Sequence, residues 1–172
     1  GLMMSKIIGV KDKKAARSAR DLGIGMQLTN IARDVYEDAQ MKRIYLPASW
    51  IPNISLTNLK NSNDSNNEKD NEISSAINKT INLSEKFYKN GFAGLKYIPP
   101  STRLGIFIAA NVYKGIGIKI KNNKKKYFRE RVYLNLFEKS LITFKSILVF
   151  LFIPFIQYQY EKIRNSLPNE NL

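Results

Sequence analysis

The stretch NIARDVYEDA, from Asn30 to Ala39, combines helix-favouring residues with a regular polar pattern. Asn30, Asp34 and Asp38 follow one another at intervals of four. On a helix, such residues share nearly one face and lie about 6 Å apart along the axis. Gln27, one turn earlier, extends this column of oxygen-bearing side chains. An ordinary solvated face is the competing interpretation, but this stretch carries no lysine in a chain that uses lysine freely.

The residues around the column predict one long helix over residues 13–40. Asp12 is suited to cap its first turn, and no proline interrupts it. Gly23 and Gly25 each destabilise a helix by about 1 kcal/mol relative to Ala, so we expect close packing around them. An apolar stripe with helical spacing is predicted to face the core, and it consists of Leu28, Ala32, Val35 and Ala39.

Helical periodicity returns further along the chain, and no strand-like alternation of useful length occurs. We expect helices over residues 73 to 91 or 94, over residues 101–118, and from Val132 onward. Residues 58–72 are almost all polar, which predicts a flexible loop before the first of these helices. The fold class is therefore predicted to be all-α.

With 172 residues and a hydrophobic content of 44%, the chain is large enough for one domain with a core. It contains no cysteine and no histidine, which excludes disulfides, thiolate metal sites and a histidine general base. We therefore expect a reducing, cytoplasmic location. The net charge of +14 favours a polyanionic partner, such as nucleic acid, anionic lipid or a phosphorylated substrate. A surface shaped by biased base composition explains the charge equally well.

The polar column has the chemistry of a site for a hard cation. Carboxylate and amide oxygens suit Mg²⁺, which usually keeps water or phosphate oxygens in its coordination shell. Arg33 lies beside the column, and Arg43 and Tyr45 follow within one loop. Because a guanidinium group binds phosphate through two contacts, these residues together predict a diphosphate site. An ordinary surface pair between Arg33 and Glu37, four residues apart, is the alternative for that arginine.

The sequence ARDLGIGMQLTNIARDVYEDAQMKRIYLP, from Ala19 to Pro47, resembles the second aspartate-rich signature of the squalene and phytoene synthase family. The pattern Q-x-x-N-x-x-R-D-x-x-x-D followed by R-I-Y-L-P is far more restrictive than an isolated D-x-x-x-D. Weaker similarity in GFAGLKYIPPSTRLGIFIAANVY and YFRERVYL extends the resemblance to about Leu141. It favours bacterial phytoene synthases over squalene synthases.

The resemblance implies the all-α isoprenoid synthase (terpenoid synthase) fold, in which helices surround an apolar cavity. It implies that Mg²⁺, with Mn²⁺ as an alternative, is held against the diphosphate by Asn30, Asp34 and Asp38. The residues expected to bind substrate are Gln27, Asn30, Arg33, Arg43, Tyr45 and Arg131. The residues expected to act in catalysis are Arg33, Asp34, Asp38 and Tyr113.

The reaction implied by the resemblance is head-to-head condensation of two prenyl diphosphates. Two geranylgeranyl diphosphates would form phytoene through a cyclopropyl diphosphate, and a squalene or dehydrosqualene synthase is the alternative. The family's first aspartate-rich motif does not occur in this sequence. We therefore expect residues 1–145 to be the carboxyl-terminal part of one prenyl-synthase domain. The amino-terminal half of that domain would be needed as a partner, and we expect the 172 residues alone not to catalyse the reaction.

Two alternatives come from other functional classes. The segment KIKNNKKKYFRERVY, residues 119–133, mixes basic and aromatic residues as a nucleic-acid-binding module does. That interpretation leaves the carboxylate column unexplained, so we do not expect a nucleic acid partner. Residues 146–172 form a tail that begins with SILVFLFIPFIQY, an apolar run too short to span a bilayer. A basic run followed by an apolar one favours peripheral contact with the cytoplasmic face of a membrane.

Overall fold

The computed structural model describes residues 2–10, 12–52, 55–56, 59, 68–122 and 131–152. Its α-helices are α1 (Leu2–Ile7), α2 (Lys13–Arg33), α3 (Val35–Gln40), α5 (Glu68–Phe92), α6 (Pro100–Asn122) and α7 (Leu136–Phe150). Two short 3-10 helices, η1 (Ala48–Trp50) and η2 (Leu95–Tyr97), follow α3 and α5. No strand occurs in these described segments, so the prediction of an all-α fold is confirmed.

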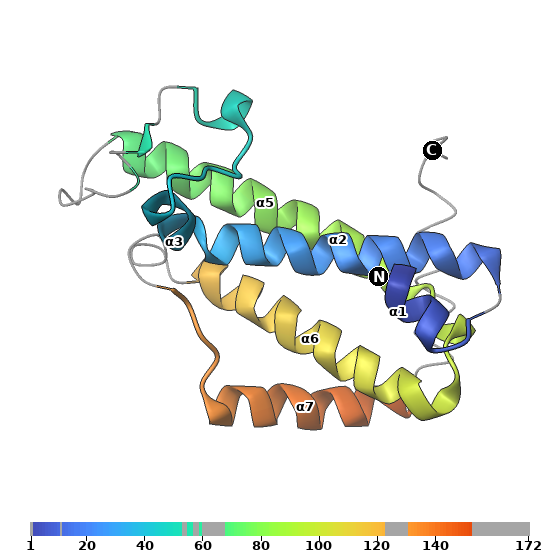
Figure 1. Ribbon diagram of the computed structural model, residues 1–172. Helices are drawn as coiled ribbons and strands as arrows, with labels where there is room; N and C mark the ends of the chain where they lie inside the picture. Colours follow the sequence, from blue (N-terminus) through green and yellow to red (C-terminus); the bar gives the residue numbers. More distant parts are fainter. Residues whose placement is uncertain are drawn as a thin grey trace.

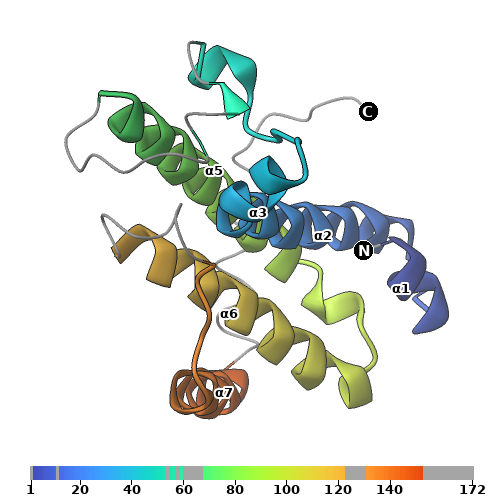
Figure 2. The same ribbon diagram turned by 60° about the vertical axis from the view of Figure 1, so that its left-hand side comes forward.

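The four long helices run back and forth beside one another (Figure 1). Helix α2 packs most extensively against α5, and α6 contacts both of them. Helix α7 packs against α6 and lies at the outer edge of the bundle, where Figure 2 shows it nearly end-on. Short α3 continues from the carboxyl end of α2 (Figure 1). This order brings the end of α2 close to the segment that leads into α7.

The core consists of two clusters along α5. The first lies around α3 and the end of α2, and its fully buried members include Ala32, Ala39, Ile73, Ala76 and Ile77. The second lies where α5, η2 and α6 meet, and it contains Tyr88, Phe92, Leu95, Phe107 and Ala110. Within it the rings of Phe92 and Phe107 meet edge to face, with centroids 5.4 Å apart. Three members of the predicted stripe, Ala32, Val35 and Ala39, are buried as expected.

Glycine allows α2 and α5 to approach closely. A Cβ atom added at Gly25 would lie 3.3 Å from the backbone oxygen of Ser84 and from the backbone nitrogen of Tyr88. A Cβ atom added at Gly91 on α5 would lie 2.8–2.9 Å from the backbone and Cβ of Leu22. The expected close packing around Gly25 is therefore confirmed, and each helix contributes a glycine to the contact.

The predicted helix over residues 13–40 is interrupted at Asp34, so the prediction of one unbroken helix is wrong there. Asp34 has φ −101° and ψ 14°, and it separates α2 from α3. Two backbone hydrogen bonds nevertheless continue across the bend, from Asp34 N–H to the Asn30 carbonyl and from Asp38 N–H to the Asp34 carbonyl, both 2.8 Å. Because this spacing of four is kept, the polar column survives the interruption.

Two other boundaries differ from the prediction. Helix α5 begins at Glu68, so the end of the predicted 58–72 loop is helical, and Leu59 is buried in the first cluster. The rest of that loop lies outside the described residues. Helix α7 begins at Leu136 rather than near Val132, because Asn135 and Glu138 form a reciprocal capping box with two hydrogen bonds of 2.7 Å.

Only the beginning of the predicted 146–172 tail, up to residue 152, belongs to the described residues. Within the described part of the chain, no helix combines the length and apolar character needed to cross a bilayer.

Candidate active site

The predicted column lies at the carboxyl end of α2 and on α3. Asn30, Asp34 and Asp38 are all partly buried, whereas Gln27 is exposed. The Asn30 side-chain oxygen is buried and has no hydrogen-bond partner among the described residues. A buried amide oxygen without a donor is unfavourable, so this atom is suited to accept a ligand. The role of Gln27 stays a prediction.

The strongest contact in the site joins Arg33 to its neighbour Asp34. The guanidinium group donates from Nε to Oδ1 and from Nη2 to Oδ2, both at 2.7 Å. This hydrogen bonding raises the pKa of Arg33, although burial acts in the opposite direction. Only 14% of the Arg33 side chain and 18% of the Asp34 side chain is exposed, so the pair is shielded from solvent. The alternative that paired Arg33 with Glu37 is therefore wrong.

Arg131, from the segment before α7, reaches the same carboxylate. Its Nε lies 3.1 Å from Asp34 Oδ1, and its Nη1 lies 3.3 Å from Glu37 Oε2. The Nε contact is an ion pair rather than a hydrogen bond, because the N–H is not directed at the oxygen. The structure thus brings together two arginines separated by almost a hundred positions, and it adds Glu37, which the sequence interpretation had treated only as a surface residue.

Asp38 lies in an electrostatically unfavourable position. Its pKa is raised by burial first, then by the charges of Asp34 and Glu37, while Arg43 lowers it. Asp38, Arg43 and Tyr45 line the same small pocket of about 10 Å³, which is too small for a substrate. Arg43 and Tyr45 themselves are exposed. The loop is therefore near the column, but its role in substrate binding stays a prediction.

Tyr113 on α6 lies on the inner side of the site. It is partly buried against the second core cluster and close enough to Arg33 to contribute to the raised pKa of the guanidinium group. Beside it, the Tyr88 hydroxyl is 3.0 Å from the Thr29 hydroxyl, and burial raises the pKa of Tyr88 to about 12. The sequence interpretation missed the Thr29–Tyr88 pair, since only the packing of α2 on α5 brings the two residues together.

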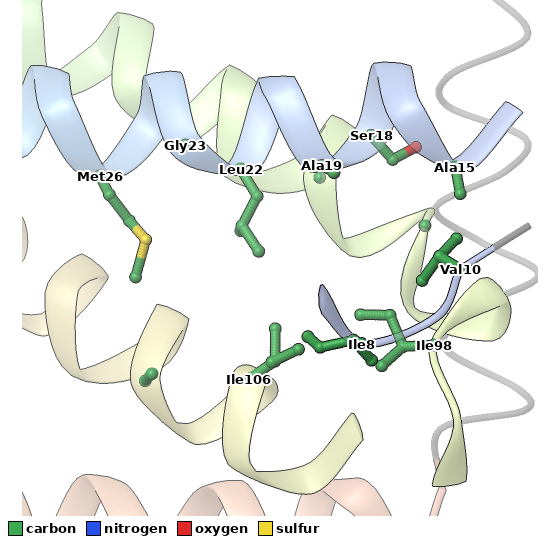
Figure 3. A pocket seen from close by; sticks show the side chains of 13 residues that line it. Ile8, Val10, Ala15, Ser18, Ala19, Leu22, Gly23, Met26, Ile98 and Ile106 are labelled. Carbon is green, nitrogen blue, oxygen red and sulfur yellow. The ribbon is translucent and has the colours of Figure 1, made fainter. Parts of the chain in front are cut away.

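An apolar cavity of about 190 Å³ lies between α2, the end of α5, α6, the residues on either side of η2 and the residues that follow α1. Figure 3 shows Leu22 and Met26 pointing from α2 toward Ile106 on α6, and Ile8 and Ile98 lie beside Ile106. The cavity-lining positions of α2 end at Met26, and Asn30 and Asp34 continue the same run in steps of four. The cavity and the polar column therefore occupy one face of α2, one after the other.

The comparison with known families agrees with this arrangement. The squalene/phytoene synthase family model matches residues 1–138, which include α1 to α6, the column and Arg131. The chain belongs to the squalene/phytoene synthase family. The family match ends within α7, after its first three residues.

Three similar curated relatives are named as phytoene synthases. The phytoene synthase of Pseudescherichia vulneris is 40% identical over 121 residues, which cover 70% of this chain and 38% of the relative. The 15-cis-phytoene synthase of Enterobacter agglomerans is 41% identical over 70% of this chain and 40% of its own. That of Pantoea ananas is 36% identical over 76% of this chain and 41% of its own. The chain thus spans about two fifths of these relatives.

The donors present would fit a hard cation only in part. No group of three or more His, Cys, Asp or Glu side chains suited to a metal occurs within the described ranges. Asn30 offers an oxygen without a partner, and Asp38 carries a charge that nearby acids disfavour. Asp34 has both oxygens engaged by Arg33. Asn30 and Asp38 would therefore bind an ion directly. Asp34 would bind it only after one of its oxygens loses the hydrogen bond from the Arg33 guanidinium group.

Proposed function

We propose that this chain takes part in the head-to-head condensation of two geranylgeranyl diphosphates to phytoene, as a prenyltransferase of carotenoid biosynthesis. The names of its relatives support this reaction. One structural observation carries the proposal: an apolar cavity on one face of α2 is followed, at the carboxyl end of that helix, by a group of arginine, carboxylate and amide side chains that Arg131 joins from the segment before α7. A prenyl diphosphate has the same two parts, a long apolar chain and a polyanionic head.

The two arginines would bind the diphosphate head. Without substrate, the charge of Arg33 is balanced by Asp34, and that of Arg131 by Asp34 and Glu37. A diphosphate offers each guanidinium group stronger and more numerous acceptors than one shared carboxylate does. Positive charge placed against the departing diphosphate favours ionisation of the allylic C–O bond, because it stabilises the negative charge that develops there. Arginine side chains remain protonated in proteins, so both guanidinium groups keep their charge throughout.

Asn30, Asp34 and Asp38 would hold Mg²⁺ between the column and the diphosphate. When bound, the ion supplies Lewis-acid stabilisation of the leaving group. The unpartnered Asn30 oxygen and the raised pKa of Asp38 support this assignment, because a cation would relieve both. Asp34 would then move from neutralising arginines to binding the ion, which leaves the arginines to the diphosphate.

The cavity would hold the prenyl chain and keep water away from a carbocation. Its volume of about 190 Å³ is modest, since engineered cavities of about 150 Å³ accept a benzene molecule. It therefore has room for a segment of one prenyl chain. Tyr113 lies between the cavity side of α6 and Arg33, where it would border the reacting end of that chain.

Calorimetry with a thio-analogue of geranylgeranyl diphosphate, which cannot ionise readily, tests this proposal. We expect binding to the protein that requires Mg²⁺ and is displaced by inorganic pyrophosphate. The farnesyl thio-analogue, tested in parallel, distinguishes a geranylgeranyl site from one built for the squalene-type substrate. Equal affinity with Mg²⁺ and with EDTA, or no competition by pyrophosphate, would contradict the proposed site.

A further inference from the structure

The segment before α7 holds Arg131 in a fixed place at the site. Burial alternates along it, because Val132 and Leu134 are only 7% and 6% exposed whereas Tyr133 is 63% exposed. Val132 belongs to the first core cluster, and a Cβ atom added at Gly115 of α6 would lie 3.4 Å from the Leu134 side chain. Residues two apart in an extended chain point to the same side, so Arg131 and Tyr133 share the side opposite to these anchors.

The other end of this segment is fixed as well. Asn135 and Glu138 cap α7 with two hydrogen bonds of 2.7 Å, and Glu138 also forms a 2.7 Å ion pair with Lys119 of α6. The backbone that carries Arg131 and Tyr133 therefore has buried anchors within it and a helix cap after it. The orientation of the long Arg131 side chain is then determined by the contacts of its guanidinium group.

That guanidinium group has two kinds of contact, one with carboxylates and one with an aromatic ring. Its Nε and Nη1 lie 3.1 Å from Asp34 Oδ1 and 3.3 Å from Glu37 Oε2. In addition, its central carbon lies over the Tyr133 ring, 5.5 Å from the ring centroid. At this separation the quadrupole of a ring attracts a cation. The Arg131 Nε is buried and has no hydrogen-bond partner among the described residues, so this donor is available to a ligand.

The two kinds of contact respond differently to an anionic ligand. A carboxylate occupies N–H donors, so a diphosphate bound by Arg131 would have to replace Asp34 or Glu37 at those donors. The ring attracts the cation through its face and contributes no acceptor atom, so a diphosphate would not compete with it. The Tyr133 contact therefore persists when the carboxylate contacts are exchanged.

We propose that Tyr133 is a positioning residue whose ring holds the Arg131 guanidinium group beside Asp34 while a diphosphate replaces the carboxylates. This inference rests on the proposed function, in which Arg131 binds the diphosphate. It explains why a largely exposed aromatic side chain follows Arg131 by two positions. An aliphatic side chain at this position would have no quadrupole, so the arginine side chain would regain freedom that it loses again when the ligand binds.

Calorimetry with inorganic pyrophosphate in EDTA tests this role on the intact protein. Tyr133→Leu should bind pyrophosphate about two- to fivefold more weakly, which corresponds to about 0.5–1 kcal/mol for an exposed contact between a cation and a ring. Tyr133→Phe keeps the ring without the hydroxyl group and should bind as the original protein does. Phe137→Leu, which removes an exposed ring of α7 outside the site, is the matched control and should also leave the affinity unchanged.

Two further variants show whether Tyr133 acts through Arg131. Arg131→Gln should itself weaken pyrophosphate binding, and adding Tyr133→Leu to it should cause no further loss, because the ring then has no cation to hold. Glu37→Gln should differ in sign from Tyr133→Leu. It removes an acceptor that competes with the ligand, so affinity for pyrophosphate should stay equal or rise.

Nuclear magnetic resonance observes the same contact without any ligand. Protons above the face of an aromatic ring resonate upfield, because the circulating ring electrons shield them. The side-chain signals of Arg131, assigned by their loss in Arg131→Gln, should therefore lie upfield in the original protein and in Tyr133→Phe. Tyr133→Leu should return them to the ordinary position of an arginine.

Three results would overturn the positioning role. The first is equal pyrophosphate affinity for Tyr133→Leu and the original protein, and the second is an equal loss from Tyr133→Leu with and without Arg131. The third is an ordinary position of the Arg131 signals in the original protein. If that protein binds the thio-analogue with Mg²⁺, these results remove the role of Tyr133 alone. If it binds neither pyrophosphate nor the thio-analogue, the proposed function fails, and the role of Tyr133 fails with it.

Discussion

The two ends of α2 are held in different ways. From Ala15 to Met26 the helix is fixed by apolar packing and by the glycine contacts with α5, and its free face lines the cavity. From Asn30 onward one side of the chain still packs in the first core cluster through Ala32 and Ala39, but the face that continues the cavity carries the ion pairs of Asp34 with Arg33 and Arg131 and an amide oxygen without a partner among the described residues. Apolar packing resists change, whereas an anionic ligand can replace a carboxylate as the partner of an arginine.

This contrast explains how one helix can bind both the apolar chain and the anionic head of one ligand. The apolar end provides a fixed wall, and small displacements there would disturb the whole bundle. At the polar end, carboxylates already neutralise the two arginines, so these charges are paired before a ligand binds.

The largest effect should come from Asp34→Asn at the polar end. The variant keeps the size of the side chain but removes the charge that balances Arg33 and Arg131. We expect Mg²⁺-dependent affinity for the thio-analogue to fall about 100-fold, because an amide at this position is a weaker Mg²⁺ ligand than the carboxylate it replaces. Calorimetry with and without Mg²⁺ measures this change.

The same variant should show that the arginines are exchangeable. With Asp34 neutral, Arg33 loses its carboxylate partner and Arg131 keeps only Glu37, so affinity for inorganic pyrophosphate in EDTA should stay equal or rise. Glu85→Gln removes a carboxylate that pairs with Lys121 at 3.5 Å, far along α5, and should change neither measurement. A parallel loss of pyrophosphate affinity in EDTA would mean that Asp34 only maintains the fold.

The next largest effect should come from Gly91→Ala at the fixed end. The added methyl group would lie 2.8–2.9 Å from the backbone and Cβ of Leu22, so α2 and α5 would have to separate. Overpacking of this kind destabilises a fold by roughly 1–3 kcal/mol. Gly105→Ala on α6 is the matched control, because a Cβ there meets nothing within 4 Å. Urea unfolding should show that the control is stabilised by about 0.5–1 kcal/mol.

A smaller and more selective effect is expected from Ala19→Leu. Ala19 lines the cavity between Ser18 and Leu22, as Figure 3 shows, so the larger side chain would occupy part of the 190 Å³. Affinity for the geranylgeranyl thio-analogue should fall about tenfold, at about 0.8 kcal/mol for each methylene group excluded. Affinity for pyrophosphate should stay the same, because the polar end is untouched. Equal losses for both ligands would show that the two ends are not separable.

Much of this arrangement could be predicted from the sequence. The spacing of Asn30, Asp34 and Asp38 and the apolar stripe opposite them located the polar end on one helix. The interruption at Asp34 could not be predicted, because both hydrogen bonds across it and the apolar spacing keep the helical period. The start of α7 was missed, although Asn135 followed three residues later by Glu138 is a capping-box signal.

The long-range parts of the site required the tertiary structure. The resemblance of YFRERVYL predicted that Arg131 binds substrate, but its contacts with Asp34 and Glu37 depend on how α6 and α7 return to α3. The cavity likewise depends on the gap left between α2 and α6 and on the residues that follow α1. Local periodicity therefore predicted which residues share one side of a helix, but it did not predict which residues of other segments lie opposite them.

The smallest effect, and the one of opposite sign, should come from Asp38→Asn. Burial and the charges of Asp34 and Glu37 raise the pKa of Asp38 above its ordinary value of 3.8. The folded protein therefore holds this proton more tightly than the unfolded chain does. The stability that the protonated form contributes is complete below pH 3.8 and is lost as the pH rises through the folded pKa.

At pH 7 the ionised Asp38 thus opposes folding, and the asparagine variant should be more stable by a few tenths of a kcal/mol, because solvent screens much of the repulsion. Urea unfolding in EDTA should show this gain at pH 7 and its disappearance as the pH falls well below 3.8, where Asp38 becomes protonated in both states. Asp34→Asn, which removes a favourable pair, should be destabilised at pH 7 instead. A destabilised Asp38→Asn would mean that this carboxylate supports the fold. A stabilised variant with weaker Mg²⁺-dependent ligand binding would mean that the polar end keeps an unfavourable charge for its ligand.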